Sequence, residues 1–325
     1  MLNDKTVLIT GGTGSFGRKF VEVALRDYKP RKVIVLSRDE LKQHEMNQKF
    51  PAGPDKVMRY FLGDVRDPDR LYRAFREVDL VVHAAALKQV PACEYNPFEA
   101  IKTNILGTKN VIDAAIARKV PKVMAISTDK AVNPINLYGA TKLCAEKMVI
   151  QANSYSFEGG SRFSACRYGN VIGSRGSVVP LFRKQAEQGC ITVTDRRMTR
   201  FWITLEQGVR FVLNCIERMQ GGEIFVPDIP SCSIMDLAHL LAPACKVQEI
   251  GIRPGEKLHE VLISTDESRQ ALRLADMFLI QPSFPWWRPS EDLQGQPLPE
   301  GFCFASNQNS RHLESDELNS MLEDC

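Results

Sequence analysis

The chain has 325 residues, of which 44% are apolar and 25% charged, and its formal net charge is +3. This composition predicts a globular protein of about two domains with a sizeable core and excludes a disordered chain. The small net charge and the lack of basic runs among aromatic residues predict no nucleic-acid partner, and no apolar stretch reaches the roughly 20 residues of a membrane span.

The nine cysteines do not follow a disulfide or zinc pattern. Their number is odd and none forms a C-x-x-C pair, which predicts reduced thiols in a cytoplasmic protein, and no apolar leader precedes the first expected strand. Cys144, Cys166 and Cys215 are expected in the core. The five histidines lack metal-ligand spacing, so no metal is predicted. His83 ends an apolar run and is expected to be a hydrogen-bonded core residue.

Short β-branched runs alternate with helical segments, which predicts βαβ units and a doubly wound parallel sheet of the Rossmann type. Strands are expected over residues 6–10, 32–36, 58–62, 80–83, 123–127 and 162–167. Helices are expected over residues 16–27, 68–77, 97–118, 137–153 and 205–219. We predict a cofactor-binding domain over 1–172, to which the helix at 205–219 returns, and a mainly substrate-binding region over 173–325. The proline-rich segment 282–301 is expected to be an irregular crossing loop.

The first chemical signal is a glycine-rich turn at residues 10–17. Gly11, Gly14 and Gly17 have the spacing G-x-x-G-x-x-G between a predicted strand and a predicted helix. Because these glycines have no side chains, the backbone N–H groups and the helix N-terminus can approach a pyrophosphate. This spacing resembles that of the short-chain dehydrogenase/reductase superfamily. The expected cofactor contacts of the turn are Gly11, Thr13, Gly14, Ser15, Phe16 and Gly17.

The residues after the second strand bear on the choice between NADP and NAD. NAD sites usually carry a carboxylate there for the ribose hydroxyls, whereas this chain has Ser37 and Arg38. The planar guanidinium group of Arg38 suits a 2′-phosphate, and Ser37 can add a hydrogen bond, which favours NADP. The alternative is an exposed Arg38 with Asp39 or Glu40 facing the ribose. Positions that resemble the superfamily's adenine-contacting turn and its helix asparagine are Asp64, Val65 and Asn104.

The catalytic signal is the segment from Tyr138 to Lys142, Tyr-Gly-Ala-Thr-Lys. A tyrosine and a lysine four residues apart lie on one face of a helix, and the ammonium group can lower the pKa of the phenol until phenolate is accessible near neutral pH. Tyr138 would then accept a proton from a substrate hydroxyl while hydride leaves its carbon for the nicotinamide. Lys142 would also bind the nicotinamide ribose.

Asp129 and Lys130 place an acid and a base directly after the strand at 123–127. A simple dehydrogenase or epimerase needs only a hydroxyl group there. An acid and a base beside a redox centre suit elimination, because oxidation at one carbon acidifies the proton on its neighbour. Burial would favour the neutral Lys130 that a base requires, and Asp129 opposes it. The alternative is a salt-bridged turn, with Asp129 capping and Lys130 solvated.

Together these motifs closely resemble the soluble, inverting UDP-N-acetylglucosamine 4,6-dehydratases that begin pseudaminic acid synthesis. The segments that carry the resemblance are 37–43, 83–88, 127–142, 167–171, 198–202 and 253–260. The likeness spans residues 4–282 and departs at Gln89, where many relatives carry histidine. We expect the soluble kind, since membrane-bound relatives carry a transmembrane extension before this region.

The resemblance implies elimination of water from UDP-N-acetylglucosamine to give a 4-keto-6-deoxy-L-arabino sugar. Tyr138 takes the O4 proton as hydride passes from C4 to NADP, and Thr128 hydrogen-bonds the C4 oxygen. Lys130 removes the C5 proton, Asp129 assists loss of the C6 hydroxyl, hydride returns to C6, and C5 is reprotonated from the opposite face. Further family positions that contact cofactor or substrate are Ala84, Ala85, Lys88, Asn170, Arg200, Arg253 and Glu256.

Three alternatives remain open. A nucleotide-sugar C4-epimerase would use the same tyrosine and lysine, and a retaining dehydratase would differ only in the configuration of its product at C5. A protein that senses NADP without activity would keep the cofactor site alone. The resemblance also implies a homo-oligomer, with a hexamer as one form.

Overall fold

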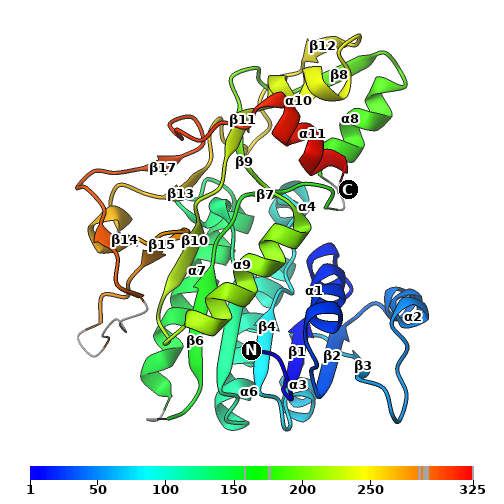
Figure 1. Ribbon diagram of the computed structural model, residues 1–325, viewed down its shortest axis with the longest axis vertical. Coiled ribbons are helices and arrows are strands. Elements are labelled where there is room, and N and C mark those ends of the chain that lie inside the picture. Colours follow the sequence, from blue (N-terminus) through cyan, green and yellow to red (C-terminus); the bar gives the residue numbers. More distant parts are fainter. Residues whose placement is uncertain (157–158, 175–176, 285–286, 288–292, 324–325) are drawn as a thin grey trace.

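The computed structural model describes residues 1–156, 159–174, 177–284, 287 and 293–323, and a large sheet runs through its centre (Figure 1). The parallel strands are β1 (Thr6–Thr10), β2 (Lys32–Ser37), β3 (Met58–Leu62), β4 (Leu80–His83), β5 (Lys122–Ile126), β6 (Arg162–Cys166) and β10 (Ile224–Pro227). They pair in the order β10-β6-β5-β4-β1-β2-β3. Every residue of β1 and β4 is buried, as a parallel sheet covered on both faces requires.

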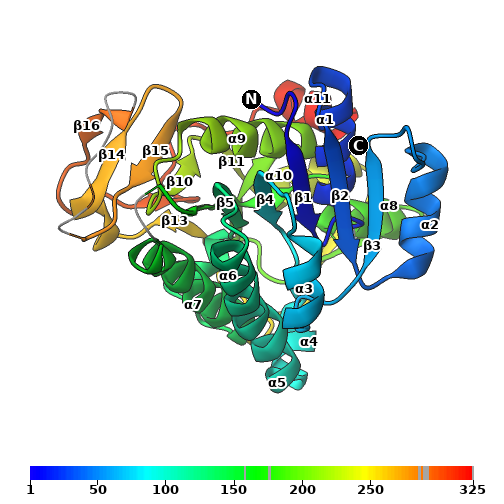
Figure 2. The same ribbon diagram turned by 90° about the horizontal axis from the view of Figure 1, so that it is seen from below.

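Helices cover both faces of this sheet (Figure 2). On one face lie α1 (Ser15–Asp27) and α9 (Leu205–Arg218), and on the other lie α3 (Pro68–Ala74), α6 (Gly107–Ala117) and α7 (Leu137–Gln151). The ion pair of Arg26 with Glu206, at 2.7 Å, joins α1 to α9. Helix α9 lies beyond residue 172 in the chain and packs on the first half of it. The predicted doubly wound parallel sheet is confirmed.

The predicted helix over residues 97–118 is divided into three parts. It begins as α5 (Pro97–Ala100), continues as a π-helical segment (Ile101–Leu106) and ends as α6. The helices that were not predicted include α2 (Glu40–Lys49) and α4 (Val90–Tyr95) in the first half of the chain, and three more after residue 172. Helix α2 buries only Gln43 and Met46, so its sequence carries no apolar stripe that would reveal it.

Residues after 172 also contribute strands to the large sheet. Strand β10 joins its parallel part, and three antiparallel strands extend that edge: β15 (Met277–Ile280), β14 (Ala271–Arg273) and β16 (Gln296–Pro297). The proline-rich segment is therefore not wholly an irregular loop, because Gln296 and Pro297 pair with Arg273 and Leu272. Pro285 and Pro289 lie outside the described residues.

A second core lies above the large sheet in Figure 1. Its elements are α8 (Val178–Ala186), β8 (Cys190–Val193), α10 (Ile234–Leu241), β12 (Lys246–Glu249) and α11 (Ser315–Glu323). Short sheets link it to the rest of the molecule, made of β7 (Asn170–Val171), β9 (Thr199–Ile203) and β11 (Ser231–Ser233), and of β13 (Val261–Ile263) and β17 (Phe304–Ala305). Residues after 172 thus build both this second core and the edge of the first sheet.

A buried ion network fixes the C-terminal segment against α7. Arg167 is fully buried and donates to both carboxylate oxygens of Glu146 at 2.8 Å and to Glu267 at 2.7 and 3.0 Å. It also donates to the carbonyl of Leu262 in β13 at 3.1 Å. Removing one partner from such a network leaves an uncompensated buried charge, so the position of β13 relative to α7 is strongly fixed.

The core predictions for single residues are met with one exception. Cys166 and Cys215 are fully buried, whereas Cys144 is exposed on α7, so its prediction is wrong. His83 is buried, and its two ring nitrogens are hydrogen-bonded to Thr10 and Thr108 at 2.8 and 3.0 Å. Burial lowers the pKa of His83 to about 3, which confirms its role as a neutral core residue.

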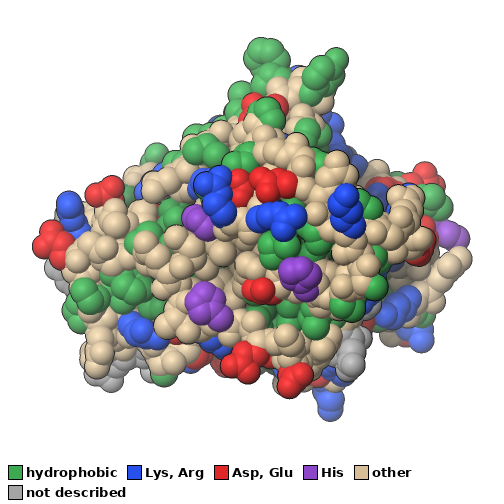
Figure 3. Space-filling model, turned by 90° about the horizontal axis from the view of Figure 1, so that it is seen from above, with side chains coloured by type: hydrophobic (Ala, Val, Ile, Leu, Met, Phe, Trp, Pro, Cys, Tyr) green, Lys and Arg blue, Asp and Glu red, His purple; other side chains and the backbone are tan. Residues whose placement is uncertain are grey.

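The surface carries charges of both signs. On the face seen in Figure 3, basic and acidic side chains lie beside one another among apolar ones, in keeping with the net charge of +3. Within the ranges that the structure describes, we find no helix with the length and apolar character needed to cross a bilayer.

Candidate active site

A cavity of about 610 Å³ opens at the carboxyl ends of the parallel strands, between the large sheet and the C-terminal segment. Strands β1 and β4 are neighbours here, and the chain leaves them toward opposite edges of the sheet, which is where doubly wound folds bind their ligands. The predicted site residues on its wall are Gly11, Gly14, Ser15, Phe16, Gly17, Ala84, Ala85, Lys88, Thr128, Lys130, Tyr138, Lys142, Asn170, Arg200, Arg253 and Glu256.

A second hollow of about 210 Å³ shares Gly11 and Ala85 with this cavity. The other predicted residues that line it are Thr13, Ser37, Arg38, Asp64 and Val65. Two predicted residues, Asn104 and Asp129, line neither space. Nearly all of the site residues predicted from the sequence therefore line one of two adjoining hollows.

The glycine turn has the close approaches that its spacing predicts. Gly11 has a φ angle of +66°, and a Cβ atom there would lie 2.9 Å from the Cα atom of Ala85. A Cβ atom on Gly17 would lie 2.4 Å from the carbonyl oxygen of Gly12. Gly14 precedes α1, and no side chain caps this helix. Its first N–H groups are therefore left for an anion such as a pyrophosphate.

The second hollow carries two cations. The Arg38 side chain is half exposed, and its nearest carboxylate is that of Asp64 at 3.5 Å. Asp39, the alternative ribose ligand, instead caps α2 by accepting the backbone N–H of Lys42 at 3.0 Å and pairs with the Lys42 ammonium group. Lys42 also lines the hollow and was missed by the sequence analysis, although it lies within the segment 37–43. Asp39 also lines the hollow beside Arg38 and Lys42, but its carboxylate is engaged with its own helix.

Asn104 has a different position from the one expected. It is buried, its amide oxygen accepts the N–H of Leu87 at 2.8 Å, and its amide nitrogen donates to the Leu87 carbonyl at 2.9 Å and to Thr141 at 3.0 Å. Asn104 therefore holds the loop of residues 84–88 against α7 from behind. It positions the cavity wall and does not form part of it.

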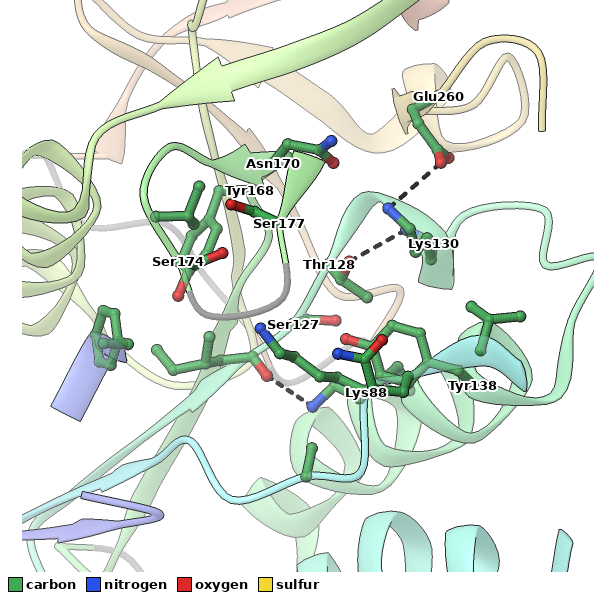
Figure 4. A pocket seen from close by; sticks show the side chains of 18 of the residues that line it. Lys88, Ser127, Thr128, Lys130, Tyr138, Tyr168, Asn170, Ser174, Ser177 and Glu260 are labelled. Atoms are coloured by element: carbon green, nitrogen blue, oxygen red, sulfur yellow. Dashed lines mark hydrogen bonds and ion pairs between the residues drawn. The ribbon is translucent and has the colours of Figure 1, made fainter. Parts of the chain in front are cut away.

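Tyr138 and Lys142 lie on α7 and line the cavity, and Figure 4 shows Tyr138 there. Burial raises the pKa of Tyr138 to about 12, opposed by the ammonium group of Lys130 and by a hydrogen bond with Thr128. Burial lowers the pKa of Lys142 to about 8, and its ammonium group donates to the carbonyl of Ile126 at 2.7 Å. Lys130 is the cation that lowers the pKa of Tyr138 here, and the effect of Lys142 on that pKa stays a prediction.

Helix α7 packs directly on the turn that carries Lys130. A Cβ atom on Gly139 would lie 2.1 Å from the carbonyl oxygen of Lys130. The side chain of Asn136 accepts the N–H of Gly139 at 2.8 Å and donates to the carbonyl of Gly255 at 2.8 Å, which ties the start of the helix to the C-terminal segment. The glycine between Tyr138 and the rest of the motif is therefore required by a backbone contact.

We expect Gly139→Ala to lower the free energy of unfolding by about 1–3 kcal/mol, the usual cost of overpacking, and to reduce activity by displacing Lys130. Urea unfolding followed by circular dichroism measures the first effect. Gly208→Ala in α9 is the matched control, since a Cβ atom on Gly208 would meet no atom of the described residues within 4 Å. Equal stability of the two variants would contradict the contact.

Lys130 lies between two carboxylates. Its ammonium group is 3.0 Å from Oδ1 of Asp129. It is also 3.3 Å from Oε1 of Glu260, a pair that Figure 4 shows. Asp129 is fully buried behind it and accepts the Thr128 hydroxyl at 2.9 Å, whereas Glu260 is on the cavity wall. The turn Asp129–Ala131 is capped by Thr128 and not by Asp129.

Burial lowers the pKa of Lys130 and Asp129 opposes this effect, both as expected, and together with Glu260 it raises the pKa above the ordinary value. Asp129 lies behind the cavity wall here, and its approach to the C6 hydroxyl when substrate binds stays a prediction. The sequence analysis missed Glu260, whose only signal was its place at the end of the segment 253–260.

The predicted nucleotide-binding residues come together on the far side of the cavity. Asn170, Arg200, Arg253 and Glu256 all line it. The guanidinium group of Arg200 donates to the carbonyls of Thr199, Lys257 and Leu258 at 2.7 to 2.9 Å. Arg200 thus holds the segment of Glu256 and Arg253 in place, and the exposed Arg253 is better placed to meet a diphosphate.

A family model described as "Polysaccharide biosynthesis protein" matches residues 7–282. The chain belongs to this family. It is 52% identical to the "UDP-N-acetylglucosamine 4,6-dehydratase (inverting)" of Campylobacter jejuni, over 98% of this chain and 97% of that protein. It is 43% identical to the "UDP-glucose 4-epimerase" of Rickettsia canadensis, over 86% of this chain and 84% of that protein. The resemblance inferred from the motifs is confirmed.

Solved structures agree with this membership of the polysaccharide biosynthesis family. The fold matches Pen from Bacillus thuringiensis with a TM-score of 0.90 and 39% identity, covering 100% of this chain and 98% of that one. It also matches DesIV, a dTDP-glucose 4,6-dehydratase from Streptomyces venezuelae, with a TM-score of 0.67, 23% identity and coverage of 78% and 86%. The second match shows the shared fold alone.

Proposed function

We propose that this protein is an inverting UDP-N-acetylglucosamine 4,6-dehydratase. The observation that carries the proposal is the position of Lys130, an amine on the cavity wall between two carboxylates and beside Tyr138. An epimerase needs only the tyrosine and its hydroxyl partner, whereas elimination also needs a group that removes a proton from carbon. The dehydratase of Campylobacter jejuni, at 52% identity, supports the same choice over the epimerase at 43%.

We propose NADP as the cofactor, because the residues present fit it. Neither Gly11 nor Gly17 has room for a Cβ atom, so the turn keeps the tight shape in which backbone N–H groups can meet a pyrophosphate. Arg38 and Lys42 border the second hollow, where a 2′-phosphate would bring two negative charges. Bound there, NADP would supply the hydride acceptor for oxidation at C4 and the hydride donor for reduction at C6.

Different side chains of the cavity carry out the different proton transfers. Tyr138 takes the proton of the O4 hydroxyl, helped by the nearby ammonium group of Lys130 and by the Thr128 hydroxyl, which lower its pKa against the effect of burial. Lys142 binds the nicotinamide ribose. Lys130 then removes the C5 proton, and Asp129 orients Lys130 and Thr128 from behind. The roles of Asn170, Arg253 and Glu256 are to bind the nucleotide, with Lys88 toward the sugar or its phosphates.

We further propose a cytoplasmic homo-oligomer that acts at the start of pseudaminic acid synthesis, as the family resemblance implies. Strongly exposed apolar side chains support the oligomer: Tyr95 is 87% exposed, Phe98 73% and Leu106 47%, on the neighbouring segments α4, α5 and the π-helical turn. Such groups are usually covered by another chain.

Incubation with UDP-N-acetylglucosamine and NADP tests the proposed function. Mass spectrometry should show a product that has lost one water molecule and that reacts as a ketone. An isomeric nucleotide sugar of unchanged mass would show an epimerase, and bound NADP with no product would show a sensor.

Cofactor choice can be tested at Arg38. We expect Arg38→Ala to weaken NADP binding by about 1.5–3 kcal/mol, the range for a hydrogen bond to a charged group, and to leave NAD binding nearly unchanged. Calorimetric titration of each cofactor measures the two affinities. Equal losses for both would contradict the assignment of Arg38 to the 2′-phosphate.

A further inference from the structure

Glu260 is a buried carboxylate that the account above does not use. Its side chain is 3% exposed, yet it reaches the cavity wall and points at Lys130 from the C-terminal segment (Figure 4). Its backbone N–H and carbonyl are both bonded to Ser306, at 3.0 and 2.8 Å, which fixes its position. One carboxylate oxygen, Oε1, is 3.3 Å from the ammonium group of Lys130. The other, Oε2, is buried and has no hydrogen-bond partner in the described part of the chain.

The charged groups that face Glu260 come from three neighbouring elements. Lys130 and Asp129 belong to the turn after β5, Arg200 to β9, and Lys257 to its own segment. Lys257 is 4.0 Å from Oε2, but its ammonium group donates to the carbonyl of Val132 at 2.6 Å. Lys130 is thus the cation nearest to Glu260 among these groups, and it is also the one that must lose a proton.

The two carboxylates beside Lys130 differ in how well their charge is stabilised. Each has one buried oxygen without a hydrogen-bond partner in the described residues, Oδ2 of Asp129 and Oε2 of Glu260. The other oxygen of Asp129, Oδ1, accepts hydrogen bonds from both the Thr128 hydroxyl and Lys130, whereas Oε1 of Glu260 has the ion pair with Lys130 at 3.3 Å alone. Hydrogen bonds to a charged carboxylate favour its charged form. Burial raises the pKa of Glu260 above the ordinary value although Lys130 opposes this. Of the two, Glu260 is the better proton acceptor.

We propose that Glu260 receives a proton from Lys130 and so leaves the neutral amine that removes the C5 proton. This inference rests on the proposed dehydratase function. In the transfer an N–H bond of Lys130 breaks, its electron pair stays on Nζ, and an O–H bond forms on Glu260. The neutral amine then takes the C5 proton, and this proton leaves with the C6 hydroxyl as water. No oxidant or other reactant is needed.

Burial favours transfer of the proton from Lys130 to Glu260 over a pair in which both groups stay charged. A buried ion pair carries a desolvation cost for both partners, and the neutral pair does not. Because the proton moves inside the pair, the fraction of neutral Lys130 does not depend on pH in the neutral range. Without Glu260 the proton must pass to water, and the neutral fraction then rises about tenfold per pH unit below the pKa of Lys130.

The test is Glu260→Gln, which keeps the shape of the side chain and removes its proton-accepting ability. In a single turnover with UDP-N-acetylglucosamine, NADPH should form at nearly the wild-type rate. Exchange of the C5 hydrogen in heavy water should be slower at pH 7 by about 10²-fold or more, the usual contribution of a proton-transfer group. Measured relative to the rate of NADPH formation at each pH, this exchange rate should climb with pH in the variant and stay flat in the wild type.

The pH profile separates this role from a structural one. Glu223→Gln is the matched control, since Glu223 is a fully buried carboxylate, bonded to Ser164 at 2.5 Å and absent from the cavity wall. It should keep the flat profile even if its melting temperature falls. Wild-type exchange and a flat profile in Glu260→Gln would overturn the inference. If the wild-type protein itself yields no dehydrated product, the proposed function fails instead.

Discussion

Tyr138→Phe should fold and bind NADP normally yet lose turnover by ~10²–10⁴-fold, the loss expected when a general base is removed. The phenol lies on the cavity wall beside Lys130 and Thr128, and no other tyrosine of α7 is available, since the helix holds Tyr138 alone. Oxidation at C4 must precede elimination, because the C5 proton becomes acidic only once C4 is a ketone. The variant should therefore be blocked before any NADPH forms.

Stopped-flow absorbance of NADPH in a single turnover checks this block. Burial raises the pKa of Tyr138 to about 12, so the oxidation rate of the wild-type protein should rise with pH as phenolate becomes more accessible. This dependence should vanish in Tyr138→Phe. Tyr155→Phe, at a side chain that is 67% exposed, is the control that should behave as wild type. Normal NADPH formation in Tyr138→Phe would require another group to take the O4 proton.

Lys130→Ala should separate oxidation from elimination. NADPH should still form in a single turnover, more slowly at neutral pH, because the ammonium group of Lys130 helps to lower the pKa of Tyr138. The C5 hydrogen should not exchange with solvent, and the 4-keto-6-deoxy product should be nearly absent, a loss of at least ~10²-fold. High pH should not restore the product, in contrast to Glu260→Gln, since the amine itself is missing.

Proton NMR in heavy water measures both the exchange and the product. Lys147→Ala, at an exposed residue of α7, controls for the loss of a lysine that does not line the cavity. If Lys130→Ala made the product with normal labelling at C5, the base would lie elsewhere and the role of the Asp129 and Lys130 pair would be wrong.

The central strands were predicted nearly to the residue, and the physical reason is their burial. Strands β1 and β4 have the predicted bounds, because buried parallel strands read as short continuous apolar runs between turns. The edge strand β3 also has its predicted bounds, although Met58 is its one buried residue. Helix α2 was missed because it lies at the edge of the sheet and buries only two side chains. The return of β10 and β15 to the sheet was also missed, since strand order depends on contacts between residues far apart in the chain.

The site residues also divide into those that a local sequence pattern reveals and those that meet only in the fold. Glycine spacing and the Tyr138 and Lys142 pair are local patterns, so the sequence located them without knowledge of the fold. Glu260 contacts Lys130 across 130 positions of the chain, and no local pattern records that contact. The charge of Lys130 follows from it, because Asp129 and Glu260 together outweigh burial. The sequence also could not show that backbone carbonyls surround the guanidinium group of Arg200, whose role as a phosphate ligand stays a prediction.

The central claim, inverting dehydration, is tested most directly by one incubation. The wild-type protein is mixed with UDP-N-acetylglucosamine and NADP in heavy water, and the product is followed by NMR from the first turnovers. The account predicts a 4-keto-6-deoxy sugar with deuterium at C5 and the L-arabino configuration. A C4 epimer that keeps its C5 hydrogen, or a keto sugar of D-xylo configuration in those first turnovers, would contradict it.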